Sequence, residues 1–293
     1  MSFFKKYRDK QDGTIRFYDI KSSWIKFISI LIFLACIIMV VIAIFPALWV
    51  FLASFKDIQE FRRTPTLFPN KYNFNVFLKT WNELHFLKYY LNSFIAVAGS
   101  TICAIFFNGL LAYGLAILKP KGYKIVTGLV MWSLLIPATT SMVSLFVNIT
   151  RVGLDGTFLP LWLAAGANAF YVLLFKQFFE QLPKELIEAS ELDGCSNFKI
   201  FYKIVFPLSV PIVMVVAIFA ACAAWSDFLL PYLVLSNTDK VTVMVRLFQF
   251  RTSNTNDVDV LRAIVFSIIP PIILFTIFQK QITQSVVSAG IKG

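Results

Sequence analysis

Long apolar stretches alternate with short polar segments along most of the chain. A helix that crosses about 30 Å of hydrocarbon needs about 20 predominantly apolar residues. Stretches of roughly this length occupy residues 27–52, 90–118, 125–149, 158–175, 207–235 and 263–278. The pattern therefore predicts an all-α, polytopic membrane protein with six transmembrane helices, preceded by an N-terminal segment at residues 1–26.

The composition agrees with a membrane protein. Of the 293 residues, 58% are hydrophobic and only 15% are charged, and the mean hydropathy is +0.74. Soluble domains are about 45–50% apolar and about 25% charged, so a soluble globular enzyme is excluded as the default. The first stretch, 27–52, is much longer than the apolar core of a secretory signal peptide, about 7–15 residues, which favours an uncleaved span.

Positive charge predicts how the spans are oriented. Lys and Arg number 27 against 16 Asp and Glu, for a net charge of +11. Seven of these cations precede the first span, and Lys119, Lys121 and Lys124 follow the second. Cytoplasmic loops carry an excess of Lys and Arg, and two crossings separate these groups, so both are expected in the cytoplasm. The loop 177–207, the tail 279–293 and both termini then lie on the cytoplasmic side of a prokaryotic cell membrane.

The sequence lacks the residues and motifs that several kinds of function would need. Apart from Asp227, no acid lies near the interior of a span, which disfavours an ion-coupled secondary transporter. No phosphate-binding loop, catalytic signature or metal-ligand spacing occurs; His85 stands alone and the four cysteines form no C-x-x-C. No basic cluster has the polar pattern of a nucleic-acid site, so the cations are expected to meet membrane lipid. We predict no catalytic residues, no metal and no cofactor bound by this chain.

The cytoplasmic loop 177–207 departs from the apolar composition around it. Pro183 and Gly194 bracket a predicted helix at 184–193, and Ser196 can cap a second, amphipathic helix that reaches about residue 205. The first helix carries four acids, Glu185, Glu188, Glu191 and Asp193. A ten-residue helix is marginal alone in water. The loop is therefore either a solvated connection or a contact that is stabilised by docking to a cytoplasmic subunit.

Three motifs carry a resemblance to a known family. Glu188-Ala189-Ser190, three residues, Gly194, nine residues and Ile204-x-x-Pro207 resemble the EAA loop of ATP-binding-cassette (ABC) importer permeases, with Ser190 and Phe206 replacing the usual Ala and Leu. Trp225-x-Asp227-Phe228-x-x-Pro231 and the ending Ser288-Ala289-Gly290-x-Lys292-Gly293 resemble segments of carbohydrate-importing members. The resemblance covers residues 27–293 and is greatest to the maltose-type inner permease.

The resemblance implies a type I ABC importer permease fold, with one permease domain over residues 27–293. It implies that the first loop helix is a coupling helix seated on an ATPase subunit. The residues implied at that contact are Glu185, Glu188, Ala189, Ser190, Asp193, Gly194, Ile204 and Pro207. The tail residues implied to touch the ATPases are Ser288, Ala289, Gly290, Lys292 and Gly293, although a frayed terminus is the alternative.

The same resemblance implies the partners and leaves two roles open. The partners are a second homologous permease, two ATPase subunits that hold ATP and Mg²⁺, and an extracytoplasmic solute-binding protein that delivers a sugar. The loop 236–262 either contacts that binding protein or is a plain flexible loop. Trp225 either stacks on a sugar or anchors at the interface, and Asp227 either lines the pathway or caps a helix. A membrane scaffold or channel without ATPases remains an alternative, and a membrane-embedded glycosyl-transfer enzyme is a weaker one.

Overall fold

The computed structural model describes residues 23–63, 66–253 and 255–290, with side chains described as far as Gln279. The described residues are helical or irregular and contain no strand. Contacts divide the chain into two compact units, residues 1–72 and 73–293, which we call unit one and unit two and describe separately. The expected single permease domain over 27–293 stays a prediction.

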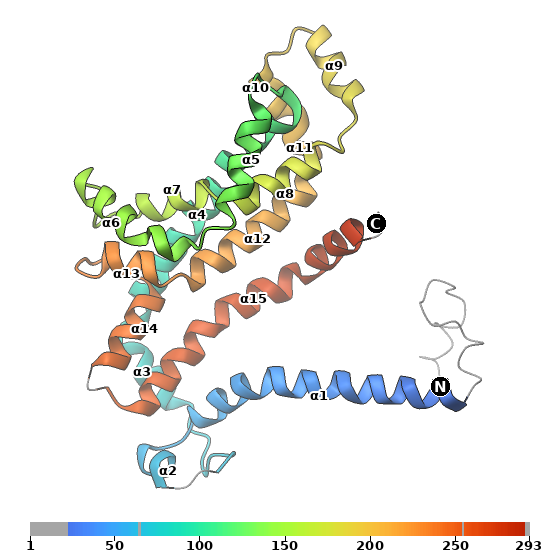
Figure 1. Cartoon of the computed structure of the whole chain (residues 1–293). Coiled ribbons are helices and arrows are strands. Elements are labelled where there is room, and N and C mark those ends of the chain that lie inside the picture. Colours follow the sequence, from blue (N-terminus) through green and yellow to red (C-terminus); the bar gives the residue numbers. More distant parts are fainter. Residues whose placement is uncertain (1–22, 64–65, 254, 291–293) are drawn as a thin grey trace. The chain divides into compact units, whose positions relative to one another are not determined.

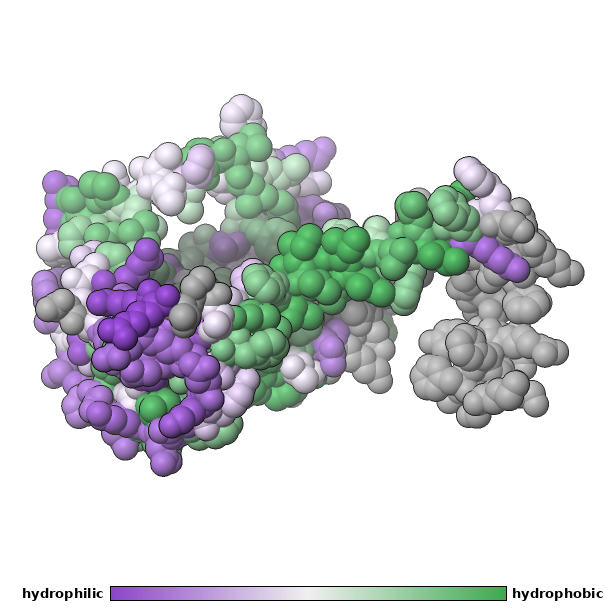
Figure 2. Space-filling model, turned by 90° about the horizontal axis from the view of Figure 1, so that it is seen from below, coloured by the Kyte–Doolittle hydropathy of each residue, from purple (hydrophilic) through white to green (hydrophobic). Residues whose placement is uncertain are grey.

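Unit one is built on a single long helix. Helix α1 (Ser23–Ala53) includes the first predicted span, and the short helix α2 (Ile58–Arg63) follows it. The apolar side chains of α1 are exposed all round within this unit, and Figure 2 shows the helix as a nearly continuous hydrophobic rod. A helix that is hydrophobic on every side is expected in a membrane, where lipid tails solvate it.

Unit two contains the remaining elements (Figure 1), and its buried apolar residues form three clusters. Its elements are α3 (Asn75–Glu83), α4 (Phe86–Tyr113), η2 (Gly114–Leu118), α5 (Tyr123–Ser133), η3 (Ala138–Ser141), α6 (Met142–Arg151), α7 (Leu159–Gly166), α8 (Ala169–Phe179), α9 (Lys184–Leu192), α10 (Asn197–Ile200), η4 (Phe201–Val205), α11 (Phe206–Leu208), α12 (Val210–Ser226), α13 (Leu229–Leu235), α14 (Val243–Thr252) and α15 (Asp257–Gly290). Helix α4 packs against α7, α8 and α12, and α15 packs against α12.

Small residues allow α4 and α7 to cross closely. A Cβ atom on Gly99 would lie 2.2 Å from the indole of Trp162, and one on Gly166 would lie 2.9 Å from the ring of Phe107. Helices within membranes approach each other at such small residues because packing contacts drive their association. The crossing therefore requires glycine at both positions.

By length and apolar composition the described residues contain three helices that could each cross a membrane, and six spans, as predicted, if each of three bent helix pairs is one span. Alone, α1, the continuous helix α4–η2 and α15 are long and apolar enough to cross a membrane. Three bent pairs supply the others: α5 with η3–α6 at 96°, α7 with α8 at 42°, and the helix Asn197–Leu208 with α12 at 83°. The sequence pattern did not predict these bends, because hydropathy records where a segment is apolar and not where its axis turns.

Two predicted boundaries differ from the structure. The fifth stretch, 207–235, was expected to be one span, yet α12 ends at Ser226 and α13 begins at Leu229, with Asp227 extended between them. The sixth span begins at Asp257 rather than residue 263, and its helix continues through the predicted polar tail to Gly290. Polar residues at a helix end change its solvation but do not stop the backbone hydrogen bonding.

The bend between α7 and α8 is stabilised by a buried polar side chain. Asn108 of α4 is 1% exposed, and its Nδ2 donates to the carbonyl oxygens of Ala104 at 2.7 Å and Ala165 at 2.9 Å. Its Oδ1 accepts from the backbone N–H of Asn168 at 2.9 Å. Asn168 in turn caps α8 by accepting from the N–H groups of Phe170 and Tyr171. Backbone groups freed at a break need such partners inside a membrane.

Candidate functional site

The acidic helix of the 177–207 loop lies at one end of unit two. Figure 1 shows α9 and α10 at this end, which we call the α9 end, and α3 and α14 at the opposite end, which we call the α14 end. Helix α9 spans Lys184–Leu192, so the predicted helix at 184–193 is confirmed. Pro183 occupies the N-cap rather than the first helical turn.

Helix α9 ends in a complete Schellman motif. The N–H of Gly194 donates to the Glu191 carbonyl at 3.0 Å, and the N–H of Cys195 donates to the Ser190 carbonyl at 3.0 Å. Gly194 has φ +75°, while a Cβ atom built on it would meet nothing within 4 Å. Left-handed backbone, and not lack of space, therefore requires glycine here. The predicted helix stop is confirmed.

One side of α9 faces its own unit and the rest is uncovered. Ser190 is 8% exposed, and its Oγ donates to the Leu186 carbonyl at 2.6 Å. Ile187 is half-buried against the main core cluster, whereas the side chain of Leu192 is 90% exposed. The predicted contact residues that are exposed are Glu185, Glu188, Ala189, Asp193 and Gly194. The structure thus brings five of the predicted residues to the surface of one short helix and its cap, and turns Ser190 inward.

The four carboxylates of this helix form no ion pair within the part of the chain that the structure describes. Glu185, Glu188, Glu191 and Asp193 are all exposed. Their negative charge is therefore directed to solvent, together with exposed apolar surface at Leu186 and Leu192. Such a mixed surface suits a groove that is apolar at its centre and basic at its rim.

The second helix of the loop is anchored to α4. The Tyr113 hydroxyl donates to the Asn197 carbonyl at 3.1 Å, and its ring lies 5.2 Å from that of Phe201. The predicted helix from Ser196 forms as α10, η4 and α11, with one π-helical turn, but the Ser196 side chain makes no capping hydrogen bond. Phe198 and Tyr202, two aromatic residues of this amphipathic helix, are exposed.

The last two predicted coupling residues lie on this second helix. Ile204 is half-buried in η4, and Pro207 is exposed in α11. Sequence reasoning missed Tyr113, which belongs to another span. Its only signal was an aromatic residue with a polar tip near one end of that span, a position that many tyrosines occupy without such a role.

The two predicted pathway residues are set into the packing of unit two. Trp225 is 4% exposed, and its indole N–H donates to the Ser267 carbonyl at 3.0 Å. Its ring lies 5.5 Å from that of Tyr90 and 5.6 Å from that of Phe94. Asp227 is half-buried in the break between α12 and α13, beside the backbone N–H groups that begin α13. The pathway roles of Trp225 and Asp227, and the alternative capping role of Asp227, stay predictions.

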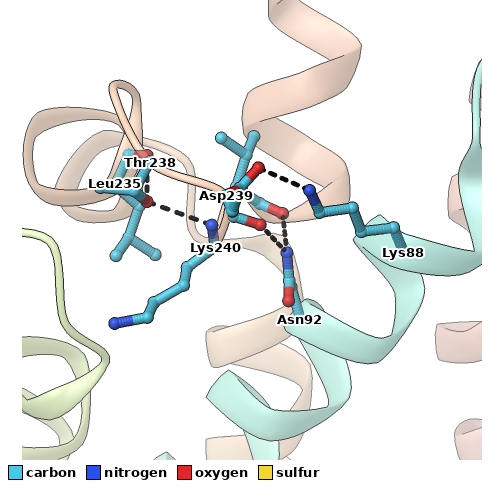
Figure 3. A network of polar contacts seen from close by, with 7 residues as sticks. Lys88, Asn92, Leu235, Thr238, Asp239 and Lys240 are labelled. Atoms are coloured by element: carbon cyan, nitrogen blue, oxygen red, sulfur yellow. Dashed lines mark hydrogen bonds and ion pairs between the residues drawn. The ribbon is translucent and has the colours of Figure 1, made fainter.

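The loop between α13 and α14 is held by side chains from α4 (Figure 3). The Lys88 Nζ lies 2.6 Å from the Asp239 carboxylate, and Asn92 Nδ2 donates to the carbonyls of Asp239 at 2.9 Å and Val241 at 3.0 Å. Lys240 Nζ reaches the Gly156 carbonyl at 2.9 Å. The ion pair with Lys88 lowers the pKa of Asp239. This part of the predicted 236–262 loop is therefore held in place by an ion pair and several hydrogen bonds.

The second part of the predicted 236–262 loop connects α14, which ends at Thr252, to α15, which begins at Asp257. Asp259, in the first turn of α15, accepts from the Thr80 hydroxyl at 3.1 Å and pairs with Arg262 at 2.6 Å. Of the predicted tail contacts, Ser288, Ala289 and Gly290 belong to the last turn of α15, and their side chains lie outside the described residues. Lys292 and Gly293 lie outside the described residues altogether.

These features define a polytopic membrane protein that presents a capped acidic helix at one end. A family model described as "Binding-protein-dependent transport system inner membrane component" matches residues 105–288. The chain belongs to this family of transporter permeases, as the resemblance of its loop motif implied.

Relatives of known name match over most of their length. The arabinooligosaccharides transport system permease protein AraQ of Halalkalibacterium halodurans is 32% identical over 86% of this chain and 92% of its own. The diacetylchitobiose uptake system permease protein NgcG of Streptomyces coelicolor is 30% identical over 84% and 83%. A crystal structure of a bacterial ABC transporter involved in the import of alginate shares the fold, with a TM-score of 0.77, 21% identity and coverage of 88% and 98%.

Proposed function

We propose that this chain and a second homologous permease form the translocation pathway of an ABC importer for a sugar or oligosaccharide. The named relatives support this substrate class, because they belong to uptake systems for arabinooligosaccharides and diacetylchitobiose. An extracytoplasmic solute-binding protein delivers the sugar. The chain has no enzymatic role, and two partner ATPase subunits bind ATP and Mg²⁺ and hydrolyse the ATP.

The exposed acidic surface of α9 is the observation that carries the proposal. A helix of this length gains little stability by itself, yet its C-terminus is fully capped and its carboxylates are unpaired within the described residues. Docking into a cleft of an ATPase subunit would cover the exposed leucines and neutralise the charge. Glu185, Glu188, Ala189, Asp193 and Gly194 are the proposed contact residues, with Ser190 fixing the helix from behind.

The orientation follows from the same contact. If α9 meets an ATPase, the α9 end and both termini are cytoplasmic, which agrees with the lysines at the turn that follows η2. The α14 end then faces the solute-binding protein. The tail beyond Gln279 is proposed to reach the ATPase subunits, and Trp225 and Asp227 are proposed to influence the pathway from its wall.

Movement of α9 can reach the spans through two attachments. Helix α10, which follows α9 in the loop, joins α12 through η4 and α11. The Tyr113 hydroxyl of α4 donates to the Asn197 carbonyl of α10. Because α4 and α12 pack against each other, closure of the ATPase dimer would rock them as one body. Ile204 and Pro207 lie on the connecting segment and are proposed to transmit this motion.

The test is a charge reversal at Glu188, which is exposed and makes no ion pair within the described residues. The Glu188→Lys variant should insert normally but lose most bound ATPase, because a like charge would oppose a basic cleft rim. The transporter is purified from its own membranes, ATP hydrolysis is measured, and uptake is tested with labelled maltose, raffinose, diacetylchitobiose and arabinotriose.

The matched control is Glu83→Lys, since Glu83 is an exposed helical glutamate near the α14 end. We expect the control to keep ATPase binding within about twofold. A wild-type protein that co-purifies with no ATPase, or a Glu188→Lys variant with full ATP-linked uptake, would contradict the proposed function. The first outcome would favour a scaffold or channel.

A further inference from the structure

Two consecutive prolines interrupt the hydrogen bonding of α15. In an α-helix the N–H of residue i donates to the carbonyl of residue i−4. Pro270 and Pro271 lie inside α15 and have no N–H to donate. The carbonyls that lose their helical donors are therefore those of Phe266 and Ser267. In an apolar environment each unsatisfied carbonyl is costly.

Side chains from two other helices donate to these two carbonyls. The Tyr90 hydroxyl of α4 donates to the Phe266 carbonyl. The Trp225 indole N–H of α12 donates to the Ser267 carbonyl at 3.0 Å. The two donors thus replace, one for one, the backbone donors that the prolines removed. Trp225 is buried in this role, and Tyr90 lies against its ring.

The packing of α15 changes at the same place. Before the prolines, Val258, Ala263 and Ser267 are buried, and Pro270 is the last buried residue. Among the described side chains after it, as far as Gln279, none is buried. The N-terminal half of α15 is therefore packed into unit two, whereas the C-terminal half is largely uncovered.

We propose that Tyr90 and Trp225 are positioning residues that fasten α15 to α4 and α12 at the double proline, so that this point is the pivot of α15. Both donors hold carbonyls on the N-terminal side of the break. That half moves with α4 and α12 as one body, while the C-terminal half, which lacks two backbone hydrogen bonds and has few packing partners, can change its angle. The pivoting of α15 rests on the proposed transport function, but its attachment by the hydrogen bonds of Tyr90 and Trp225, which we call the fastening, does not.

The fastening is tested on the full chain in detergent by thermal unfolding of paired variants. Tyr90→Phe and Trp225→Phe each remove one donor and should lower Tm by about 2–4 °C. Pro270→Ala restores a backbone donor for the Phe266 carbonyl, and Pro271→Ala restores one for the Ser267 carbonyl. In the Pro270→Ala background, the loss of Tm caused by Tyr90→Phe should therefore fall by at least half. In the Pro271→Ala background, the loss of Tm caused by Trp225→Phe should fall by the same amount. We call these two combinations the matched pairs.

Crossed pairs are the control for this experiment. Tyr90→Phe combined with Pro271→Ala, and Trp225→Phe combined with Pro270→Ala, should keep nearly the full loss of Tm, because the restored donor faces the wrong carbonyl. Ordinary loss of packing would give the same result in matched and crossed backgrounds. Equal losses in the two sets would overturn the proposal.

The pivot is tested on the assembled transporter, by measuring sugar taken up per ATP hydrolysed with whichever sugar of the panel the wild type imports. The variant Pro270→Ala/Pro271→Ala makes α15 continuous and should lower this ratio at least tenfold while the complex stays assembled. Pro46→Ala, within α1, is the control and should leave the ratio unchanged.

An unchanged ratio in the double-proline variant would overturn the pivot. A wild type that hydrolyses ATP without importing any sugar would instead contradict the proposed substrate class. In that case the matched and crossed pairs still decide whether Tyr90 and Trp225 fasten α15.

Discussion

The two ends of unit two satisfy their polar groups in different ways. At the α14 end, Lys88 and Asn92 of α4 hold the loop that carries Asp239, more than a hundred residues away in sequence. At the α9 end, the hydrogen bonds that shape α9 come from its own cap, and its carboxylates have no ion-pair partner within the described residues. Polar groups of the loop at the α14 end thus find their partners within this chain. The α9 end instead retains charged and apolar surface that is suited to a partner protein.

The largest effect that would test this contrast is expected at Leu192. Its side chain is 90% exposed on α9, so Leu192→Asp should leave the Tm of the isolated chain within about 1 °C. Binding of the ATPase should weaken about tenfold or more, because an apolar contact is replaced by a buried charge. Titration of the purified permease with ATPase measures the change.

The control for Leu192 is Val152→Asp, on the exposed turn that follows α6. Val152 is also exposed and apolar, and helix α6, which it follows, lies away from α9 in unit two (Figure 1). Equal loss of ATPase binding in both variants would show that α9 is not a distinct docking surface.

The next effect concerns the loop between α13 and α14. Asn92→Ala removes two hydrogen bonds to backbone carbonyls of this loop and should destabilise the chain by about 1–2 kcal/mol. The loop near Asp239 should become more sensitive to limited proteolysis, while ATPase binding at the α9 end is retained. Loss of ATPase binding without a change in proteolysis would contradict the contrast between the two ends.

A smaller effect is expected at Gly194. Gly194→Ala places a Cβ atom on a left-handed residue and should cost about 1 kcal/mol, seen as a lower Tm. Gly128→Ala is the matched control, because a Cβ atom there also meets nothing within 4 Å but Gly128 lies within helix α5, without a positive φ. We expect the control to be neutral or stabilising. The same loss in both variants would mean that the backbone conformation of Gly194 is not what requires glycine.

The smallest effect should come from the pH dependence of the Lys88–Asp239 pair. A carboxyl group whose pKa is lowered in the folded state adds stability above its unfolded pKa, and this stability is lost as the pH falls through the folded pKa. The hydrogen bond from Lys88 lowers the pKa of Asp239 below 3.8. Wild type should therefore exceed Lys88→Gln in Tm at pH 7, and the difference should vanish once the pH has fallen well below 3.8.

The difference will be small because the Asp239 side chain is 94% exposed and solvent screens the pair. Raising the salt concentration at pH 7 should reduce it further. A difference that grows as the pH falls would contradict the assigned role of the pair.

Local features of the loop could be predicted from the sequence because neighbouring residues determine them. Pro183 and Gly194 mark the ends of α9, and the Schellman motif involves residues within one turn of that glycine. The inward turn of Ser190 was not predicted, since it depends on which face of α9 packs against the core. The exposure of Phe198 and Tyr202 could not be predicted for the same reason, because amphipathic spacing identifies a face but not the neighbour that covers it.

The sequence alone determined the membrane class, the six apolar segments, the acidic helix and the family, because these depend on composition and on motifs with fixed spacing. Only the tertiary structure decided which spans bend and which side chains pair with freed backbone groups, as Asn108 does at the start of α8 and Tyr90 does at the prolines of α15. A proline in the sequence shows that a backbone carbonyl loses its helical donor and needs another partner. The partner itself comes from a helix distant in sequence, so only the packing of those helices specifies it.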